Sequence, residues 1–198
     1  MQWGCGSRSS ETTFHRMADQ ITTAEVTISK TKTEIIKEAK RIEEALLFSS
    51  KRHFEASRLW SLFHLVIGIP VVVISAVAGA TAFAEFDKKH VVAGILSLVV
   101  VGLSSVLTFL NPNAKAAAHQ IAGNKYDSLM NEARIFWSID CWQGDSEEIL
   151  TGKVKYLSER RSNLNQTCPQ TSRFAYKLAK RGIEAGEAKY KVDDQVSP

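Results

Sequence analysis

Two long stretches without any charged residue dominate the sequence. The 26 residues between Arg58 and Glu85 contain no Asp, Glu, Lys or Arg, and neither do the 24 residues between His90 and Lys115. A helix that crosses the hydrocarbon layer of a bilayer needs roughly 20 predominantly apolar residues, so each stretch is long enough. Two buried helices of a soluble protein are the alternative, but soluble helices normally keep a charged or polar face. The sequence therefore predicts two transmembrane helices.

The segment between these spans is short and polar. We place the spans at 59–84 and 91–111, and residues 85–90 (EFDKKH) then leave room only for a turn, which makes the pair an antiparallel hairpin. Pro70 lies inside the first span and predicts a kink, which membrane helices tolerate. Pro112 predicts the end of the second span, because the residue before a proline is biased away from the helical conformation.

Both ends of the hairpin continue into amphipathic helical patterns. Residues 25–58 form one amphipathic helix with an apolar face, and the helix runs into the first span without a break. Residues 114–192 form further helices, with breaks at Gln143-Gly144-Asp145 and at Thr167-Cys168-Pro169. Residues 1–24 are expected to be a disordered tail, and residues 193–198 a C-terminal tail. The expected fold class is all-α: an integral membrane protein with a two-helix hairpin and a cytosolic helical bundle.

The distribution of lysine and arginine predicts the orientation. Five such residues lie on the N-terminal flank of the hairpin and three on the C-terminal flank, whereas the turn carries only Lys88 and Lys89. Counting only lysine and arginine, as the positive-inside rule requires, places both termini in the cytosol. Because the first 20 residues contain no apolar signal-peptide core, the first span is expected to be an uncleaved anchor in the cell (inner) membrane.

Each span carries one face of small or polar residues. At 100° per residue these positions fall near one line on each helix. The candidate positions are Ser61, His64, Gly68, Ser75 and Gly79 on the first span, and Ser97, Ser104, Thr108 and Asn111 on the second. Two interpretations remain open. Small residues let helix backbones approach one another, and an oligomer can also line a pore with such residues. One stripe can form a contact between helices while the other lines a pore.

His64 is the one ionisable residue within either span. Ionisable groups inside a membrane are functional candidates by default. His64 lies only a few residues into the span, however, where an imidazole still reaches water, and an interfacial anchor is the simpler interpretation.

No pattern in the chain indicates catalysis. The five histidines have no metal-ligand spacing, and no nucleophile elbow or phosphate-binding loop is present. Cys5, Cys141 and Cys168 are odd in number and widely spaced, which argues against disulfides or a zinc site. Basic residues are dispersed among acids, which argues against nucleic-acid binding. We therefore expect a non-enzymatic protein without cofactor or metal.

The order of several short runs resembles the SLATT family, the two-transmembrane effector domains associated with SMODS and SLOG proteins. The runs are SKRHFEASRLW from Ser50, then Gly68-Ile69-Pro70, LTFLNP from Leu107, Asn131-Glu132-Ala133-Arg134, and KRGIEAGE from Lys180. The resemblance covers roughly residues 40–192. It implies a pore-forming or membrane-perturbing effector in a bacterial defence system, triggered by a nucleotide-synthesising or nucleotide-sensing partner protein.

The leading hypothesis is therefore a homo-oligomeric effector in the lipid bilayer. The alternative is a structural anchor or scaffold, whose cytosolic helices recruit a soluble partner. A fixed homo-oligomer with contacts between spans favours the effector, and a monomer holding a soluble partner favours the scaffold.

Overall fold

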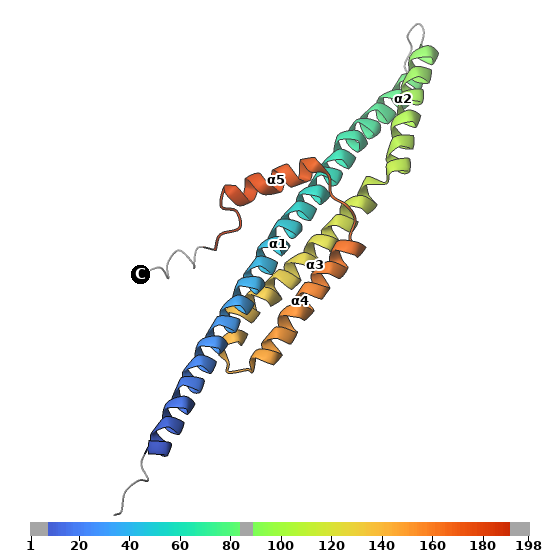
Figure 1. The fold of residues 1–198 in the computed structure, drawn as a ribbon. Helices are drawn as coiled ribbons and strands as arrows, with labels where there is room; N and C mark the ends of the chain where they lie inside the picture. Colours follow the sequence, from blue (N-terminus) through green and yellow to red (C-terminus); the bar gives the residue numbers. More distant parts are fainter. Residues whose placement is uncertain (1–7, 84–88, 191–198) are drawn as a thin grey trace, which may run out of the picture. The chain divides into compact units, whose positions relative to one another are not determined.

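The computed structural model describes residues 8–83 and 89–190, and the side chains of 30–81, 83 and 90–190. These residues form five α-helices and one short 3₁₀ helix, and no strand occurs within the described ranges, so the all-α prediction is confirmed. The helices, drawn in Figure 1, are α1 (Arg8–Phe83), α2 (Lys89–Leu110), α3 (Pro112–Ser138), η1 (Asp140–Trp142), α4 (Glu147–Thr167) and α5 (Arg173–Glu184).

Helix α1 differs from the expectation at its N-terminal end. The sequence predicts a disordered tail over 1–24, but α1 already begins at Arg8. Extending an existing helix costs far less than starting one, and the sequence has no glycine or proline from Arg8 until Gly68. The amphipathic helix and the first uncharged stretch are one continuous element, as the sequence predicts.

The hairpin turn falls partly outside the described residues. Lys89 and His90, which the sequence assigns to the turn, instead belong to the first turn of α2. Residues 84–88 and 193–198, which carry the rest of the predicted turn and the predicted C-terminal tail, lie outside the described part of the chain.

The chain divides into two compact units, described here one at a time. The first comprises Met1–Ala45 and Leu129–Ser162, and its core joins α1, α3 and α4. Ala39, Ile42, Leu129, Ala133 and Cys141 are wholly buried in it. Its polar contacts link the same helices: the Trp137 indole nitrogen donates to Glu43 at 2.5 Å, and Arg160 forms an ion pair with Glu132.

The second unit comprises Leu46–Ser128 and Asn163–Pro198. Outside the uncharged stretches, the helices of this unit are closely packed. A Cβ atom added to Gly123 of α3 would lie 2.7 Å from the Phe54 ring of α1, so glycine is required for this approach. The Tyr126 hydroxyl, on a residue 2% exposed, donates to the Asn165 side chain at 3.0 Å.

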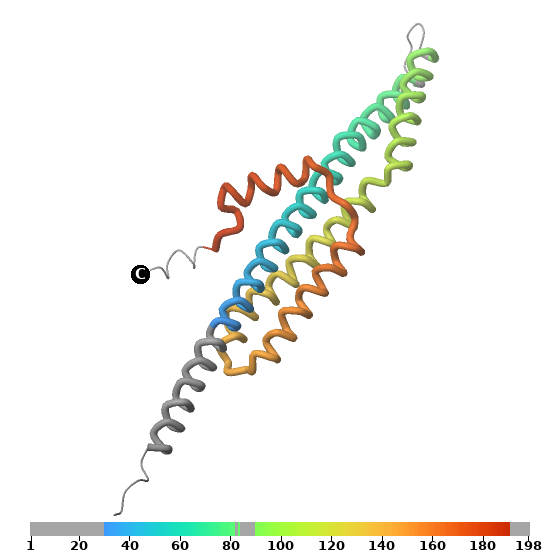
Figure 2. The backbone as a smooth tube through the Cα atoms, in the orientation of Figure 1, coloured from blue at the N-terminus to red at the C-terminus, as the bar shows by residue number. Residues whose placement is uncertain are grey.

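Asn111 separates α2 from α3, and the backbone changes direction there (Figure 2). Its φ of 43° lies in the left-handed region, where asparagine is one of the few tolerated residues. The Asn111 side chain also accepts a hydrogen bond from the Ala114 amide at 3.3 Å, which caps α3. Pro112 occupies the first position of α3, where its missing N–H costs nothing.

Helix α5 ends at Glu184, before the end of the region 114–192 that the sequence assigns to helices. Gly186, with φ of 87°, follows the C-terminal cap. The amide of Gly186 donates to the carbonyl of Ile183 and that of Glu187 to the carbonyl of Gly182, the two hydrogen bonds of a Schellman motif. This glycine terminates the helix at Glu184, whereas Gly182 remains inside it.

Candidate membrane-spanning hairpin

Two helical stretches of the described chain are long and apolar enough to cross a membrane, judged by length and composition. They lie within Lys30–Thr81 and His90–Trp142, and only 6% and 0% of their most apolar windows are buried inside the structure. Core helices of soluble proteins are mostly buried. The exposed aliphatic side chains include Val72 (69% exposed) and Leu98 (74% exposed).

Helices α1 and α2 present regularly spaced aliphatic positions to each other. Half-buried residues recur every three or four positions, the spacing of a helix–helix contact. They are Phe63, Ile67, Val71, Ile74 and Ala78 on α1, and Ala93, Leu96, Val100, Leu103 and Leu107 on α2. Within one chain, the hairpin contact is therefore built mainly from aliphatic side chains.

The predicted stripes of small and polar residues lie mostly outside this contact. Ser61, Ser75, Gly79, Ser97, Thr108 and Asn111 are exposed, whereas His64, Gly68 and Ser104 are half-buried. Only the half-buried positions of the two stripes therefore lie near the neighbouring helix. The exposed positions face the surroundings of the hairpin.

The hydroxyl groups of the stripes are satisfied within their own helices. Ser75 donates to the Val71 carbonyl at 2.7 Å, Ser97 to the Ala93 carbonyl at 2.8 Å, and Thr108 to the Ser104 carbonyl at 3.0 Å. In hydrocarbon an unsatisfied polar group costs several kcal/mol. These bonds allow the stripes to lie in an apolar environment, and the same hydroxyls remain able to accept a further bond.

The glycines of the spans have open space beside them. A Cβ atom added to Gly68, Gly79, Gly94 or Gly102 would meet no described atom within 4 Å. No close approach within the chain requires glycine at these four positions, in contrast to Gly123.

A cavity of about 480 Å³ lies on the hairpin, with His64, Gly68 and Leu107 among its lining residues. The other lining residues are leucine, isoleucine and valine side chains of α1. It is an apolar groove with a glycine in its wall, and it opens beside the stripe of the first span.

His64 joins the base of the first span to the start of α3. The Asn113 side-chain nitrogen lies 3.3 Å from His64 Nε2, and because an amide nitrogen only donates, Nε2 is the acceptor. The other ring nitrogen is buried and has no hydrogen-bond partner among the described residues. His64 thus helps to fix the point where the second span passes into α3.

Pro70 lies inside α1, which continues to Phe83. Neighbouring residues remain helical on both sides, and the kink that the sequence predicts at this position stays a prediction.

A buried histidine pair lies below the hairpin in the second unit. The Nδ1 atoms of His53 and His119 are 3.1 Å apart, and the His53 ring stacks on Tyr126 with centroids 5.3 Å apart. The exposed fractions are 2% for His53 and 6% for His119. Burial lowers the pKa of His53 to about 4, with smaller contributions from His119 and Arg52. Burial likewise lowers the pKa of His119. The pair is therefore neutral at pH 7.

The burial of these histidines was not predicted, although the sequence carries a signal for it. His53 continues the apolar face of α1 at spacings of four and three from Leu46 through Ser50, and His119 precedes Ala122 and Tyr126 at spacings of three and four. Histidines at core positions of amphipathic helices indicate buried side chains, but not that the two form a pair.

Comparisons of the chain with models of protein families, with curated proteins and with solved structures give no match.

Proposed function

We propose that the chain is a membrane-embedded effector whose hairpin assembles with further copies and opens a pore or perturbs the bilayer. In this proposal both termini face the cytosol and the protein lies in the cell membrane, as the distribution of lysine and arginine predicts. The observation that carries the proposal is the exposure of positions on the stripes. Ser75 and Gly79 are exposed, and a Cβ atom added to Gly79 would meet no described atom within 4 Å, although small residues are the usual contacts between membrane helices.

Two helices cannot enclose a water path alone, so pore formation requires several copies. The apolar groove beside Gly68 offers a surface for a helix of a second copy. The exposed positions Ser97 and Thr108 on α2 then lie either in the contact between copies or along the path. The resemblance to the SLATT family supports a trigger from a nucleotide-synthesising or nucleotide-sensing partner protein.

The pore is tested by ion flux across liposomes that contain the purified full-length chain, and by a membrane-potential dye in expressing cells. The double variant Ser104→Leu, Thr108→Leu removes two polar stripe positions and is expected to reduce flux at least tenfold while insertion is retained. Ser105→Leu is the matched control, because Ser105 also bonds back to its own helix but lies off the stripe. Absence of depolarisation, even with the neighbouring sensor system activated, contradicts the proposal.

A scaffold is the second candidate, and one observation favours it. Ile135 in α3, Ile139 after it and Trp142 in η1 all belong to the first unit and are 50%, 51% and 67% exposed. Exposed large apolar side chains that follow one another closely in the chain fit a soluble partner. Cross-linking in membranes separates the two functions. Contacts between spans of identical chains support the effector, whereas a monomer bound to a soluble protein supports the scaffold.

A further inference from the structure

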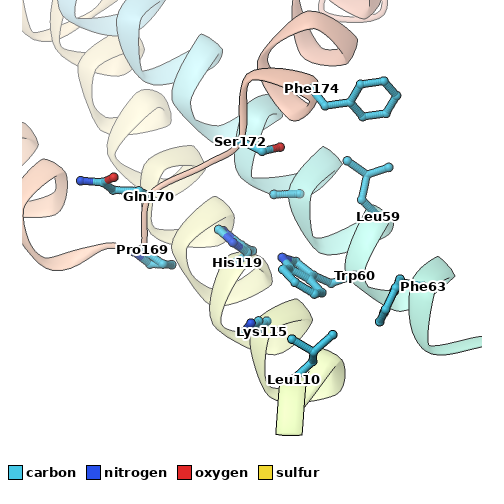
Figure 3. Close-up of a pocket in the computed structure, with 11 residues that line it drawn as sticks. Leu59, Trp60, Phe63, Leu110, Lys115, His119, Pro169, Gln170, Ser172 and Phe174 are labelled. Carbon is cyan, nitrogen blue, oxygen red and sulfur yellow. The ribbon is translucent and has the colours of Figure 1, made fainter. Parts of the chain in front are cut away.

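A second cavity, of about 570 Å³, lies in the second unit where the first uncharged stretch begins. Its lining comes from α1, from the junction of α2 and α3, and from the segment that leads from α4 into α5 (Figure 3). Three segments distant in the sequence therefore meet around one space. Leu59, the first residue of the uncharged stretch, is part of its wall.

Both apolar and polar side chains line this cavity. Leu59, Phe63, Leu110 and Phe174 supply apolar surface, and Figure 3 shows Phe174 and Leu59 on the same side of the space. Lys115, His119, Gln170 and Ser172 supply polar groups, and Lys115 lies next to Leu110. A ligand in this space would therefore contact hydrocarbon and also meet hydrogen-bonding groups.

The polar groups favour an anion. Lys115 is exposed, its Nζ lies 4.4 Å from the centroid of the Trp60 ring, and the described lining residues include no aspartate or glutamate. Within the described residues, the ion pairs of the structure do not include Lys115. The positive charge is therefore held beside an aromatic ring and is not neutralised by a carboxylate.

Helix α5 extends this positive character beyond the cavity. Lys177 and Arg181 follow Phe174 at spacings of three and four, which places all three along one edge of the helix. Ala175 and Ala179 on a different face are buried against the rest of the unit. A basic edge that begins with an exposed aromatic residue is typical of helices at a membrane surface.

We propose that this cavity binds an anionic phospholipid, with its phosphate near Lys115 and an acyl chain against Leu59, Phe63 and Leu110. A lipid reaches the site without leaving the bilayer, because the cavity lies at the start of the spans. A small soluble phosphate compound would leave the apolar walls unfilled. The inference rests on the proposed membrane insertion and adds a ligand class to it.

The test measures lipid binding to the full-length chain by native mass spectrometry from detergent, with phosphatidylglycerol and phosphatidylcholine as probes. The expected result is a preference for phosphatidylglycerol that Lys115→Gln weakens about fivefold, the effect of one basic side chain near an anionic surface. Lys125→Gln is the matched control: the same charge change on an exposed residue of α3 outside the cavity. Equal weakening by the two variants overturns the proposal.

A second pair of variants adds a charge and deletes no side chain. Gln170→Glu places a carboxylate in the lining and is expected to weaken binding of phosphatidylglycerol at least fivefold. Gln166→Glu, an isosteric change on an exposed residue outside the cavity, is expected to leave it unchanged. Circular dichroism of all four variants checks that the helical content is retained.

Two further arms identify the source of the phosphate and separate the two proposals. Inorganic phosphate at millimolar concentration is expected not to displace the lipid, and displacement indicates a site for soluble phosphate compounds, which overturns the lipid assignment. Equal binding of phosphatidylcholine and phosphatidylglycerol also overturns it. A chain that fails to remain in lipid nanodiscs contradicts membrane insertion itself. Stable insertion with no preference among lipids contradicts only the cavity assignment.

Discussion

In the second unit, the packed region around Gly123 and Tyr126 and the hairpin of α1 and α2 use the same residue types in opposite ways. Gly123 is required because the Phe54 ring occupies the space that a side chain would take, whereas Gly68, Gly79, Gly94 and Gly102 have open space beside them. The polar groups differ in the same way. The buried Tyr126 hydroxyl bonds to a residue of another helix. The hydroxyl groups of Ser75, Ser97 and Thr108 bond back to their own helices.

This difference indicates which part of the chain is complete by itself. The packed part pairs polar side chains across helices, as Tyr126 does with Asn165. The hairpin exposes aliphatic side chains and satisfies the hydroxyls of Ser75, Ser97 and Thr108 within single helices, which an apolar surrounding requires.

The largest expected effect comes from placing a charge on the hairpin. Val72 is 69% exposed, and Val72→Lys is expected to disfavour insertion by about 3 kcal/mol, the cost of lysine near the centre of a membrane helix. Extraction of membranes at alkaline pH measures this as a shift of the protein into the soluble fraction. Tyr156→Lys, at a position 57% exposed on α4, is expected to have no such effect. Equal behaviour of the two variants would contradict a bilayer around the hairpin.

The second prediction concerns Asn111, which connects the hairpin to α3. Asn111→Ala removes the side-chain cap of α3 and places an alanine at φ of 43°. Loss of a cap costs about 1 kcal/mol and left-handed backbone about another 1 kcal/mol, so stability is expected to fall by about 2 kcal/mol. Asn111→Gly keeps the backbone freedom and is expected to lose only a few tenths of a kcal/mol. Denaturant unfolding in detergent measures both. Equal losses would show that the backbone conformation is not the constraint at this junction.

The elements that local chemistry specifies were predictable from the sequence. The uncharged stretches give the apolar spans, and Pro112 and Pro169 give the positions where α2 and α4 end. The N-terminal extent of α1 was not predictable from local composition, because polar residues that would not nucleate a helix can still extend one. The C-terminal end of α5 depended on which of two glycines adopts positive φ, and Gly182 and Gly186 look alike in sequence.

The candidate site was only partly predictable, for a different reason. Periodicity assigns Ser97 or Gly79 to a face of its own helix, but it does not say what that face meets. The contact between α1 and α2 uses aliphatic residues at similar spacing, so the polar stripes were not the hairpin contact. The pairing of His53 with His119 depends on the register between two helices that are far apart in the sequence, and no local pattern sets that register.

The third prediction uses the buried histidine pair to test the packed region. The pKa of His53 is lowered from its ordinary value of 6.5 to about 4. Above pH 6.5 the imidazole is neutral in both the folded and the unfolded chain, so stability does not change with pH. Between pH 6.5 and pH 4 only the unfolded chain takes up the proton, and folding is expected to lose about 3 kcal/mol.

Thermal unfolding in detergent at pH 7.5, 6.0 and 4.5 measures this loss. His53→Gln is expected to flatten the dependence on pH between 6.5 and 4. His90→Gln, at an exposed position at the start of α2, is expected to leave it unchanged. A wild-type profile that is flat between pH 7.5 and 4.5 would contradict a neutral buried pair.

The smallest expected effect sharpens the comparison of glycines most directly. Gly123→Leu forces the Phe54 ring to move, because even a Cβ atom would lie 2.7 Å from it. Overpacking of this kind costs about 1–3 kcal/mol, and the higher helix propensity of leucine returns somewhat less than 1 kcal/mol, so a net loss of up to about 2 kcal/mol is expected. Gly102→Leu and Gly79→Leu meet open space and should leave the stability of the single chain unchanged or slightly raised. The two variants are expected to differ only in self-association, which light scattering measures. Gly79 lies on the stripe, so Gly79→Leu should weaken self-association. Gly102 lies off the stripe, so Gly102→Leu should not. If Gly79→Leu associates as well as the wild type does, the small residues of the hairpin are not the contact between copies, and the open space beside them is filled by lipid alone.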